Sequence, residues 1–350
     1  MLLSTILSLP DGLADQLTSL GILTDTELIF SNASPLEIYA RLSPKTLSFT
    51  EFEACIEALS EKLAAPGQNI LEIKQESRLN FKIETFPSLD SHLGGGLPSA
   101  RVIEISGDKG SGKTTFLLNC VLSTLLQNKN VEALWIDTTG DFSTERTMDI
   151  LQASQETHDE LEMILQRLHV STATDIESIQ EIIRAVDGQL ASDPSRRIRC
   201  IVIDTITPVV GPYLSAVSSQ GHAIMTALMR YLRHLATRYS TLILVVNNAT
   251  LMRAPSSVQE PGTFEPIPNP QSAFASTTRK PALGPSFTFM TDATLWLTVW
   301  PDPNEGEPDG STAHTVEVLR SKFSSSNVWS TFKIARTGKL ISGHLRSNSS

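Results

Sequence analysis

The residues best suited to chemistry in this chain form the run 107–114. In order they are Gly107, Asp108, Lys109, Gly110, Ser111, Gly112, Lys113 and Thr114. The glycines let the backbone turn tightly enough for its N–H groups to converge on phosphate oxygens. The lysine can neutralise the β- and γ-phosphates, and the threonine hydroxyl can coordinate Mg²⁺. The run therefore predicts a phosphate-binding loop (P-loop) for ATP with Mg²⁺.

The segments on either side of this loop are those that a P-loop requires. Residues 102–106 are apolar and read as a strand, and residues 115–122 read as a helix. The N-terminal end of that helix adds partial positive charge facing the phosphates. The order strand, loop, helix is more specific than the loop pattern alone, and Thr115 is included among the predicted nucleotide contacts.

A carboxylate ends another apolar strand further along the chain. Residues 200–203 are Cys-Ile-Val-Ile, and Asp204 follows them. The C-terminal ends of parallel strands meet at the ligand-binding edge of such a sheet. Asp204 is therefore predicted to assist Mg²⁺ together with Thr114, and Lys113, Thr114 and Asp204 form the predicted catalytic set. The alternative role for Asp204 is that of a helix cap or turn residue.

Strands that alternate with helices surround these residues and predict an α/β fold with a mainly parallel sheet. A further strand, 241–248, ends in Asn247 and Asn248, whose amides either contact the nucleotide or cap the turn. Three final strands are expected after residue 290. The remaining expected segments are strands 131–137 and 168–171, helices 176–190 and 219–239, strands 293–300, 315–321 and 328–335, and an acidic hairpin region at 302–309.

The chain divides by pattern into three parts. Residues 1–65 have helical periodicity and predict a small all-helical domain, 66–84 read as a linker, and 85–345 form the predicted nucleotide-binding core. Residues 250–286 contain many Pro, Ser, Thr and Gln residues and predict a long loop.

Composition excludes several functional classes. With 350 residues and 40% hydrophobic residues the chain can fill a sizeable core, and its net charge of −10 argues against nucleic acid covering its whole surface. No apolar run approaches the roughly 20 residues that span a bilayer, and the first ten residues lack a secretory signal, so an intracellular protein without membrane contact is expected. The three cysteines, Cys55, Cys120 and Cys200, have no metal-ligand spacing and are expected to be buried reduced thiols.

The order of these motifs resembles the RecA-like recombinase ATPases, and within them the eukaryotic paralogues of the strand-exchange recombinase. The resemblance covers most of 85–340. It rests on 89–98 (LDSHLGGGLP), the P-loop, 135–142 (WIDTTGDF) followed by Glu145 and Arg146, and the strand ending in Asp204. The segment 280–287 (KPALGPSF) is most similar to the D-type group of these paralogues.

The resemblance implies a RecA-like ATPase core and further site residues. Arg146 would support the adenine. Two DNA-facing loops would lie near 209–221 and 250–283, with the cations Arg253, Arg279 and Lys280 available for phosphate contacts. The implied partners are single-stranded or branched DNA, other recombinase paralogues and the main strand-exchange recombinase. The implied role is in homologous recombination and DNA double-strand break repair, and the implied location is the nucleus.

Two positions depart from the family pattern. Thr139 stands where active members have the glutamate that activates water, and Ala249 stands where they have a glutamine that relays nucleotide state. Losing a general base removes roughly 10²–10⁴-fold of rate, so slow DNA-dependent hydrolysis is expected, with Asp137, Asp141 or a neighbouring subunit as substitutes. The alternatives are a nonhydrolysing scaffold subunit and a P-loop phosphotransferase. Phe81, in the linker, is a candidate for docking into a neighbouring subunit or for packing between the two domains.

Overall fold

The computed structural model describes most of the chain as two compact units. The described residues are 3, 9–10, 12–31, 33–43, 47–63, 80–82, 87–154, 157–193, 197–214, 219–252, 272–274, 277–300 and 310–342. The units span Met1–Ser77 and Arg78–Ser350, and each is described here by itself.

The first unit is built from short helices with sequence-encoded starts. Its helices are α1 (Leu13–Ser19), α2 (Asp25–Ile29), α3 (Pro35–Arg41) and α4 (Phe49–Leu63). At the start of α2 the Thr24 side chain accepts from the Glu27 N–H, and the Glu27 carboxylate accepts from the Thr24 N–H; Ser34 and Glu37 repeat this capping box at α3. Leucine, isoleucine and phenylalanine side chains from all four helices form one core.

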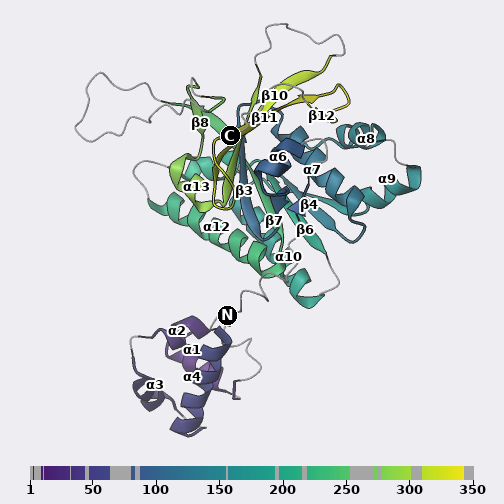
Figure 1. The fold of residues 1–350 in the computed structure, drawn as a ribbon. Helices are drawn as coiled ribbons and strands as arrows, with labels where there is room; N and C mark the ends of the chain where they lie inside the picture. Colours follow the sequence, from purple (N-terminus) through teal and green to yellow (C-terminus); the bar gives the residue numbers. More distant parts are fainter. Residues whose placement is uncertain are drawn as a thin grey trace, which may run out of the picture. The chain divides into compact units, whose positions relative to one another are not determined.

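The second unit contains a sheet that is parallel in its centre and antiparallel at one side (Figure 1). Among the described residues its strands follow the order β12-β11-β10-β9-β3-β7-β6-β4-β5, with β8 paired to β7. The parallel strands are β3 (Arg101–Gly107), β4 (Glu132–Asp137), β5 (Leu168–Thr172), β6 (Ile198–Asp204), β7 (Leu242–Leu251) and β9 (Ala293–Val299). The antiparallel strands are β8 (Arg279–Pro281), β10 (Thr312–Ser321), β11 (Val328–Ile334) and β12 (Leu340–Ser342).

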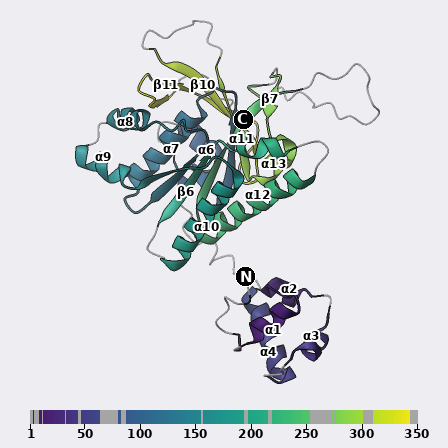
Figure 2. The same cartoon turned by 180° about the vertical axis from the view of Figure 1, so that it is seen from behind.

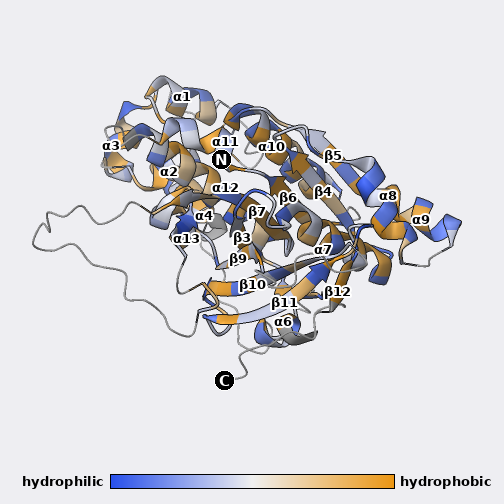
Figure 3. Ribbon diagram, turned by 90° about the horizontal axis from the view of Figure 1, so that it is seen from above, coloured by the Kyte–Doolittle hydropathy of each residue, from blue (hydrophilic) through white to orange (hydrophobic). Residues whose placement is uncertain are grey.

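Helices cover both faces of this sheet (Figures 1 and 2). Side chains alternate between the faces along each strand: Ile103 and Ile105 pack with α7 (Lys113–Gln127), whereas Val102 packs on the face of α10 (Ile176–Ser192) and α12 (Ser219–Tyr239). The remaining helices are α6 (Pro87–His92), α8 (Thr144–Gln152), α9 (His158–Leu165), α11 (Thr207–Val210), a 3₁₀ helix (Gly211–Tyr213) and α13 (Gly284–Met290). The alternation of hydrophobic and hydrophilic positions along these helices is visible in Figure 3. The predicted fold class, a mainly parallel α/β core with N-terminal helices, is confirmed.

The predicted long loop at 250–286 is partly wrong. β7 continues to Leu251, residues 279–281 form β8 antiparallel to it, and α13 begins at Gly284. Pairing with an existing strand supplies the backbone hydrogen bonds that the local sequence pattern does not predict. Residues 253–271 and the acidic region 302–309 lie outside the described residues.

Phe81 packs inside the second unit rather than in a free linker. It forms the short strand β1 (Asn80–Phe81), which pairs with β2 (Leu97–Pro98), and its side chain is buried in the core that contains Leu97 and α7. The second unit thus starts upstream of residue 85, and the alternative in which Phe81 docks into a neighbour is wrong for this arrangement because the ring is already buried within its own chain.

None of the described helices is both long and apolar enough to cross a bilayer. All three cysteines are free; Cys120 and Cys200 are buried as predicted, whereas Cys55 is only partly buried.

Candidate nucleotide-binding site

The loop 107–112 joins β3 to α7 and takes backbone conformations that require glycine. Gly110 and Gly112 have φ values of +82° and +87°, in the left-handed region. A Cβ at Gly112 would lie 2.7 Å from Cδ1 of Ile334 and 3.3 Å from Nδ1 of His314. Both conformation and crowding therefore fix glycine at position 112, and the predicted P-loop lies where a strand ends and a helix begins.

The Lys113 ammonium lies within the curve of the loop. Its Nζ donates to the carbonyl oxygens of Gly107 and Asp108 at 2.9 and 2.7 Å. Burial lowers the pKa of Lys113, and the nearby carboxylates of Asp204 and Asp108 oppose this shift. The structure therefore holds a desolvated cation at the position where a P-loop lysine meets phosphate.

Thr114 and Asp204 meet although they are distant in sequence. The Thr114 hydroxyl donates to Oδ2 of Asp204 at 2.7 Å. Burial raises the pKa of Asp204, and the Thr114 hydrogen bond and the Lys113 ammonium oppose the rise. The pairing of β4 with β6 also sets Asp137 opposite Asp204, so these two carboxylates end neighbouring strands at one edge of the sheet.

This hydroxyl and carboxylate fit a magnesium ion. Oxygen ligands from Ser/Thr and Asp are those that Mg²⁺ takes beside nucleotide phosphates. A buried carboxylate with a raised pKa is also a group whose ionised form a nearby cation would stabilise. Thr114 and Asp204 would hold the ion, which supplies positive charge to the phosphate oxygens when it is bound.

The Asp137 carboxylate accepts hydrogen bonds from backbone N–H groups of the turn that follows it. Its Oδ1 accepts from the N–H groups of Thr139 and Gly140, and its Oδ2 accepts from the N–H of Phe142, at 2.9–3.0 Å. Burial raises the pKa of Asp137, but these hydrogen bonds outweigh it and the net shift is downward. The Thr139 hydroxyl also lies 3.3 Å from Oδ1 of Asp137. Asp137 therefore holds the 138–142 turn, which makes it a poor replacement for the missing glutamate.

A cavity of about 940 Å³ opens at this edge of the sheet. Of the predicted nucleotide contacts, Lys109, Gly110, Gly112, Lys113, Thr114, Thr115 and Arg146 line it, as does Asp204. Gly107, Asp108 and Ser111 lie in the loop but do not line the cavity. Arg146 enters from α8, whose N-cap Ser143 accepts from the Arg146 N–H at 3.1 Å.

Asn119 is a site residue that the sequence reasoning missed. From α7 its Nδ2 donates to the carbonyl oxygen of Gly338 at 2.9 Å, and its Oδ1 accepts from the Leu340 N–H at 3.1 Å. This two-point contact fixes the 335–339 turn, and residues 335–338 of that turn line the cavity with Arg146. A helical asparagine one turn after a P-loop is the only sequence signal for it, and a solvent-exposed side chain would give the same signal.

His314 was also missed. It lies on β10 and lines the cavity. Its Nδ1 is 3.1 Å from the Ser111 carbonyl oxygen, its Nε2 is 2.8 Å from Oγ1 of Thr312, and its ring stacks on Phe332. Burial lowers the pKa of His314, and the contact with Ser111 opposes this. The neutral ring with Nδ1–H toward Ser111 satisfies both neighbours.

Asn247 and Asn248, for which the sequence left two roles open, have different roles in the structure. Asn247 is buried; its Nδ2 donates to Oε1 of Glu104 at 2.7 Å, and its Oδ1 accepts from the Thr207 hydroxyl at 2.9 Å. Asn248 lines the cavity. Asn247 therefore connects β7 to β3 and α11, and only Asn248 is placed to face a nucleotide.

The predicted DNA-contacting cations do not form one group in the described structure. Arg253 lies outside the described residues. Arg279 and Lys280 are both exposed on β8, and Nη1 of Arg279 lies 3.2 Å from Oδ1 of Asp108 in the P-loop. In the other predicted loop, 209–214 and 219–221 are described, and the backbone of Gly221 lies against that of Tyr213 so closely that a Cβ could not fit.

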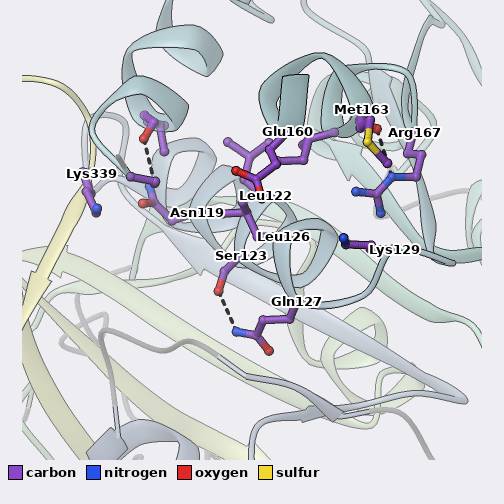
Figure 4. A pocket seen from close by; sticks show the side chains of 13 residues that line it. Asn119, Leu122, Ser123, Leu126, Gln127, Lys129, Glu160, Met163, Arg167 and Lys339 are labelled. Carbon is purple, nitrogen blue, oxygen red and sulfur yellow. Dashed lines mark hydrogen bonds between the residues drawn. The ribbon is translucent and has the colours of Figure 1, made fainter. Parts of the chain in front are cut away.

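A second cavity, of about 320 Å³, lies between α7, α8 and α9 (Figure 4). Two of the cations that line it bind backbone carbonyl groups: Arg167 donates to the carbonyl oxygens of Leu125, Asn128 and Val131, and Lys339 donates to that of Ala153. These contacts secure the C-terminal ends of α7 and α8. The cations therefore have structural roles, and the cavity is not assigned a ligand.

Comparison with known proteins places this site in a family. The Rad51 family model matches residues 80–282, which is more than half of the chain. The chain is 29% identical over 294 residues to the DNA repair protein RAD51 homolog 4 of Bos taurus, with 83% of this chain and 82% of that protein covered. It is 27% identical over 281 residues to the Mus musculus protein of the same name, with coverages of 79% and 78%.

Two further matches are a RadA protein and a solved structure. The DNA repair and recombination protein RadA of Metallosphaera sedula is 30% identical over 203 residues, covering 55% of this chain and 61% of that protein. The RadB recombinase crystal structure shares the fold, with a TM-score of 0.54 and 19% identity over 75% of this chain and 100% of that chain.

These matches agree with the resemblance drawn from the P-loop, the Asp204 strand and the 280–287 segment, since RAD51 homolog 4 is the D-type paralogue. They give no support to the phosphotransferase alternative. The family model covers both halves of the site, from the loop that carries Lys113 to the strand that ends in Asp204. This chain belongs to the Rad51 family.

Proposed function

We propose that this protein is an ATP- and Mg²⁺-binding recombinase paralogue that supports homologous recombination and the repair of DNA double-strand breaks. The observation that carries the proposal is the 2.7 Å contact between Thr114 and Asp204 beside the buried Lys113, at the mouth of the large cavity. The relatives described above are named as DNA repair and recombination proteins.

Different residues of the chain bind different parts of the nucleotide. Backbone N–H groups of the loop and the Lys113 ammonium bind phosphate oxygens, and the N-terminal end of α7 adds to their positive potential. Thr114 and Asp204 orient the metal ion. Arg146 and residues 335–338 also line the cavity and are suited to contact the base.

Hydrolysis is expected to be slow. Thr139 carries no group that can take a proton from water, and the Asp137 carboxylate is held by three backbone N–H groups. Asp141 remains as an acid at the cavity. In single-turnover measurements with single-stranded DNA present, the chain should hydrolyse ATP about 10²–10⁴-fold more slowly than a recombinase with the glutamate. An equal rate would contradict this part of the proposal.

ATP would then act mainly on assembly. A ligand that binds only the assembled or folded state stabilises that state by linkage even without turnover. We propose other recombinase paralogues and the main recombinase as partners, single-stranded or branched DNA as the nucleic acid, and the nucleus as the location. The net charge of −10 leaves few cations to attract DNA, so DNA affinity should be weak and should fall as salt is raised.

Nucleotide binding is the first test. Titration of the purified full chain with a fluorescent ATP analogue and Mg²⁺ should give saturable binding that Lys113→Ala removes. Lys129→Ala, which changes an exposed lysine just after α7, is the matched control and should bind like the wild type. Absence of measurable affinity in the wild-type chain would overturn the proposed function.

The scaffold alternative is favoured by the same threonine at position 139. It predicts that Lys113→Ala leaves partner binding and resistance to DNA damage intact, because the nucleotide would be dispensable. The assembly proposal predicts that both are lost. Co-purification with paralogue subunits and survival of complemented cells after DNA damage distinguish the two, and imaging of tagged chain in those cells tests the nuclear location.

A further inference from the structure

Arg279 makes a contact that its predicted role in DNA binding does not explain. β8 pairs with the end of β7, with Leu251 opposite Arg279, Thr250 opposite Lys280 and Ala249 opposite Pro281. Side chains alternate between the two faces of such a ribbon, so Arg279 and Lys280 leave it on opposite sides. Arg279 extends to the P-loop, where its Nη1 lies 3.2 Å from Oδ1 of Asp108.

Asp108 needs such a partner if the loop is to take a polyphosphate. A carboxylate in a phosphate-binding loop repels the incoming negative charge. Its field reaches the phosphate-binding group, since Asp108 is one of the two carboxylates that oppose the lowering of the pKa of Lys113. The backbone oxygen of Asp108 also accepts from Lys113 at 2.7 Å, so the two residues are held together.

We propose that Arg279 is a positioning residue of the nucleotide site: it neutralises Asp108, and thereby makes phosphate affinity depend on where β8 lies. This inference rests on the proposed nucleotide-binding function and deepens it. Ala249 lies on the same ribbon and cannot form a polar side-chain contact to the nucleotide. Arg279 gives the ribbon a charged contact to the P-loop instead.

The contact also limits what Arg279 can do for DNA. Its Nη1 faces Asp108, so a DNA phosphate that drew the guanidinium away would leave the Asp108 carboxylate unneutralised in the P-loop. Lys280, on the other side of the ribbon, has no such conflict. Arg279 therefore serves the nucleotide site, whereas Lys280 remains available for contacts with DNA phosphates.

The expected effect is moderate because the pair is exposed. The side chains of Arg279 and Asp108 are 43% and 35% exposed, and exposed ion pairs change an equilibrium by up to about fivefold. Removing Arg279 also leaves an unneutralised carboxylate in the P-loop. Arg279→Gln should therefore weaken Mg·ATP binding about three- to tenfold, and the loss should shrink as salt is raised.

Four further variants separate charge from folding. Arg279→Lys keeps the charge and should bind Mg·ATP within about twofold of the wild type. Asp108→Asn should bind at least as well as the wild type, and the double variant Asp108→Asn, Arg279→Gln should recover the affinity that Arg279→Gln loses. Arg238→Gln breaks a comparable exposed pair with Asp187 elsewhere and should change nothing. AMP, which lacks the β- and γ-phosphates, should bind all variants alike.

The outcomes are distinct. Weaker Mg·ATP binding in Arg279→Gln that Asp108→Asn restores, with AMP unaffected, supports the inference. Wild-type affinity in Arg279→Gln overturns it, and so does a loss that Asp108→Asn does not restore or that appears equally for AMP. If the wild-type chain binds neither nucleotide, it is the proposed function that fails.

Discussion

The hydroxyl of Thr114 lies 2.7 Å from the carboxylate of Asp204, a residue 90 positions later in the chain. Thr114 lies in the first turn of α7 and Asp204 ends β6, and these ends meet because the strands that lead to them, β3 and β6, run parallel in one sheet. The contact places the two proposed magnesium ligands side by side.

The first prediction concerns the cost of this arrangement. Burial raises the pKa of Asp204. Keeping this carboxylate ionised therefore lowers the stability of the folded chain. Asp204→Asn should leave the melting temperature without ligand unchanged or higher, yet remove most of the stabilisation that Mg·ATP gives the wild type. Thermal melts with and without Mg·ATP measure both. A variant that Mg·ATP stabilises as strongly as the wild type would exclude Asp204 from the metal site.

The second prediction concerns the contact that holds the turn at 335–339. Asn119→Ala removes the hydrogen bonds to Gly338 and Leu340 and leaves a backbone N–H without its partner. The free energy of unfolding should fall by about 1–3 kcal/mol, and nucleotide affinity should fall with it. Chemical denaturation and nucleotide titration measure the two quantities.

Ser123→Ala on the same helix is the control, because the Ser123 hydroxyl accepts only an exposed hydrogen bond from Gln127, at 3.2 Å (Figure 4). Its stability should stay within about 0.5 kcal/mol of the wild type. Equal losses in the two variants would show that the turn does not depend on Asn119.

The third prediction concerns how the stability of the folded chain depends on pH. Burial lowers the pKa of His314 from an ordinary value of 6.5, so in the range just below 6.5 the unfolded chain binds more protons than the folded chain. Stability is then greatest above pH 6.5 and falls as the pH drops through this window. His314→Gln should flatten that part of the profile, measured by denaturation at a series of pH values.

His234→Gln serves as the control for the third prediction, because His234 is exposed on α12 and does not line the nucleotide cavity. Its pH profile should follow that of the wild type over this window. A steep profile that persists in His314→Gln would assign the dependence to another group.

The fourth prediction follows from the burial of Phe81. Phe81→Ala should destabilise the second unit by about 3–5 kcal/mol, because the ring is 2% exposed within its core. Phe30→Ala, which truncates a ring that is 78% exposed, should cost less than about 0.5 kcal/mol. If Phe81→Ala keeps wild-type stability and loses only partner binding, the docking role would be restored.

The sequence alone determined the parts of this protein whose signals are local. The P-loop is contiguous, and its glycines, lysine and threonine show their roles by type and spacing. The buried strands of the parallel sheet are apolar runs of the right length, so their positions along the chain and the α/β class could be predicted, as could Asp204 at the end of one of them. The absence of a glutamate at position 139 is likewise visible without coordinates.

Tertiary structure decided whatever depends on contacts between distant segments. Asn119 and His314 are ordinary residues in sequence and gain a role only because β10 and the 335–339 turn fold against the P-loop and α7. β8 and the burial of Phe81 depend on pairing with strands that residues 242–251 and 97–98 provide, which no local propensity encodes. The pairing of Arg279 with Asp108 has the same origin. The sequence shows that both residues are charged, but only the long-range packing that brings β8 to the nucleotide loop makes them partners.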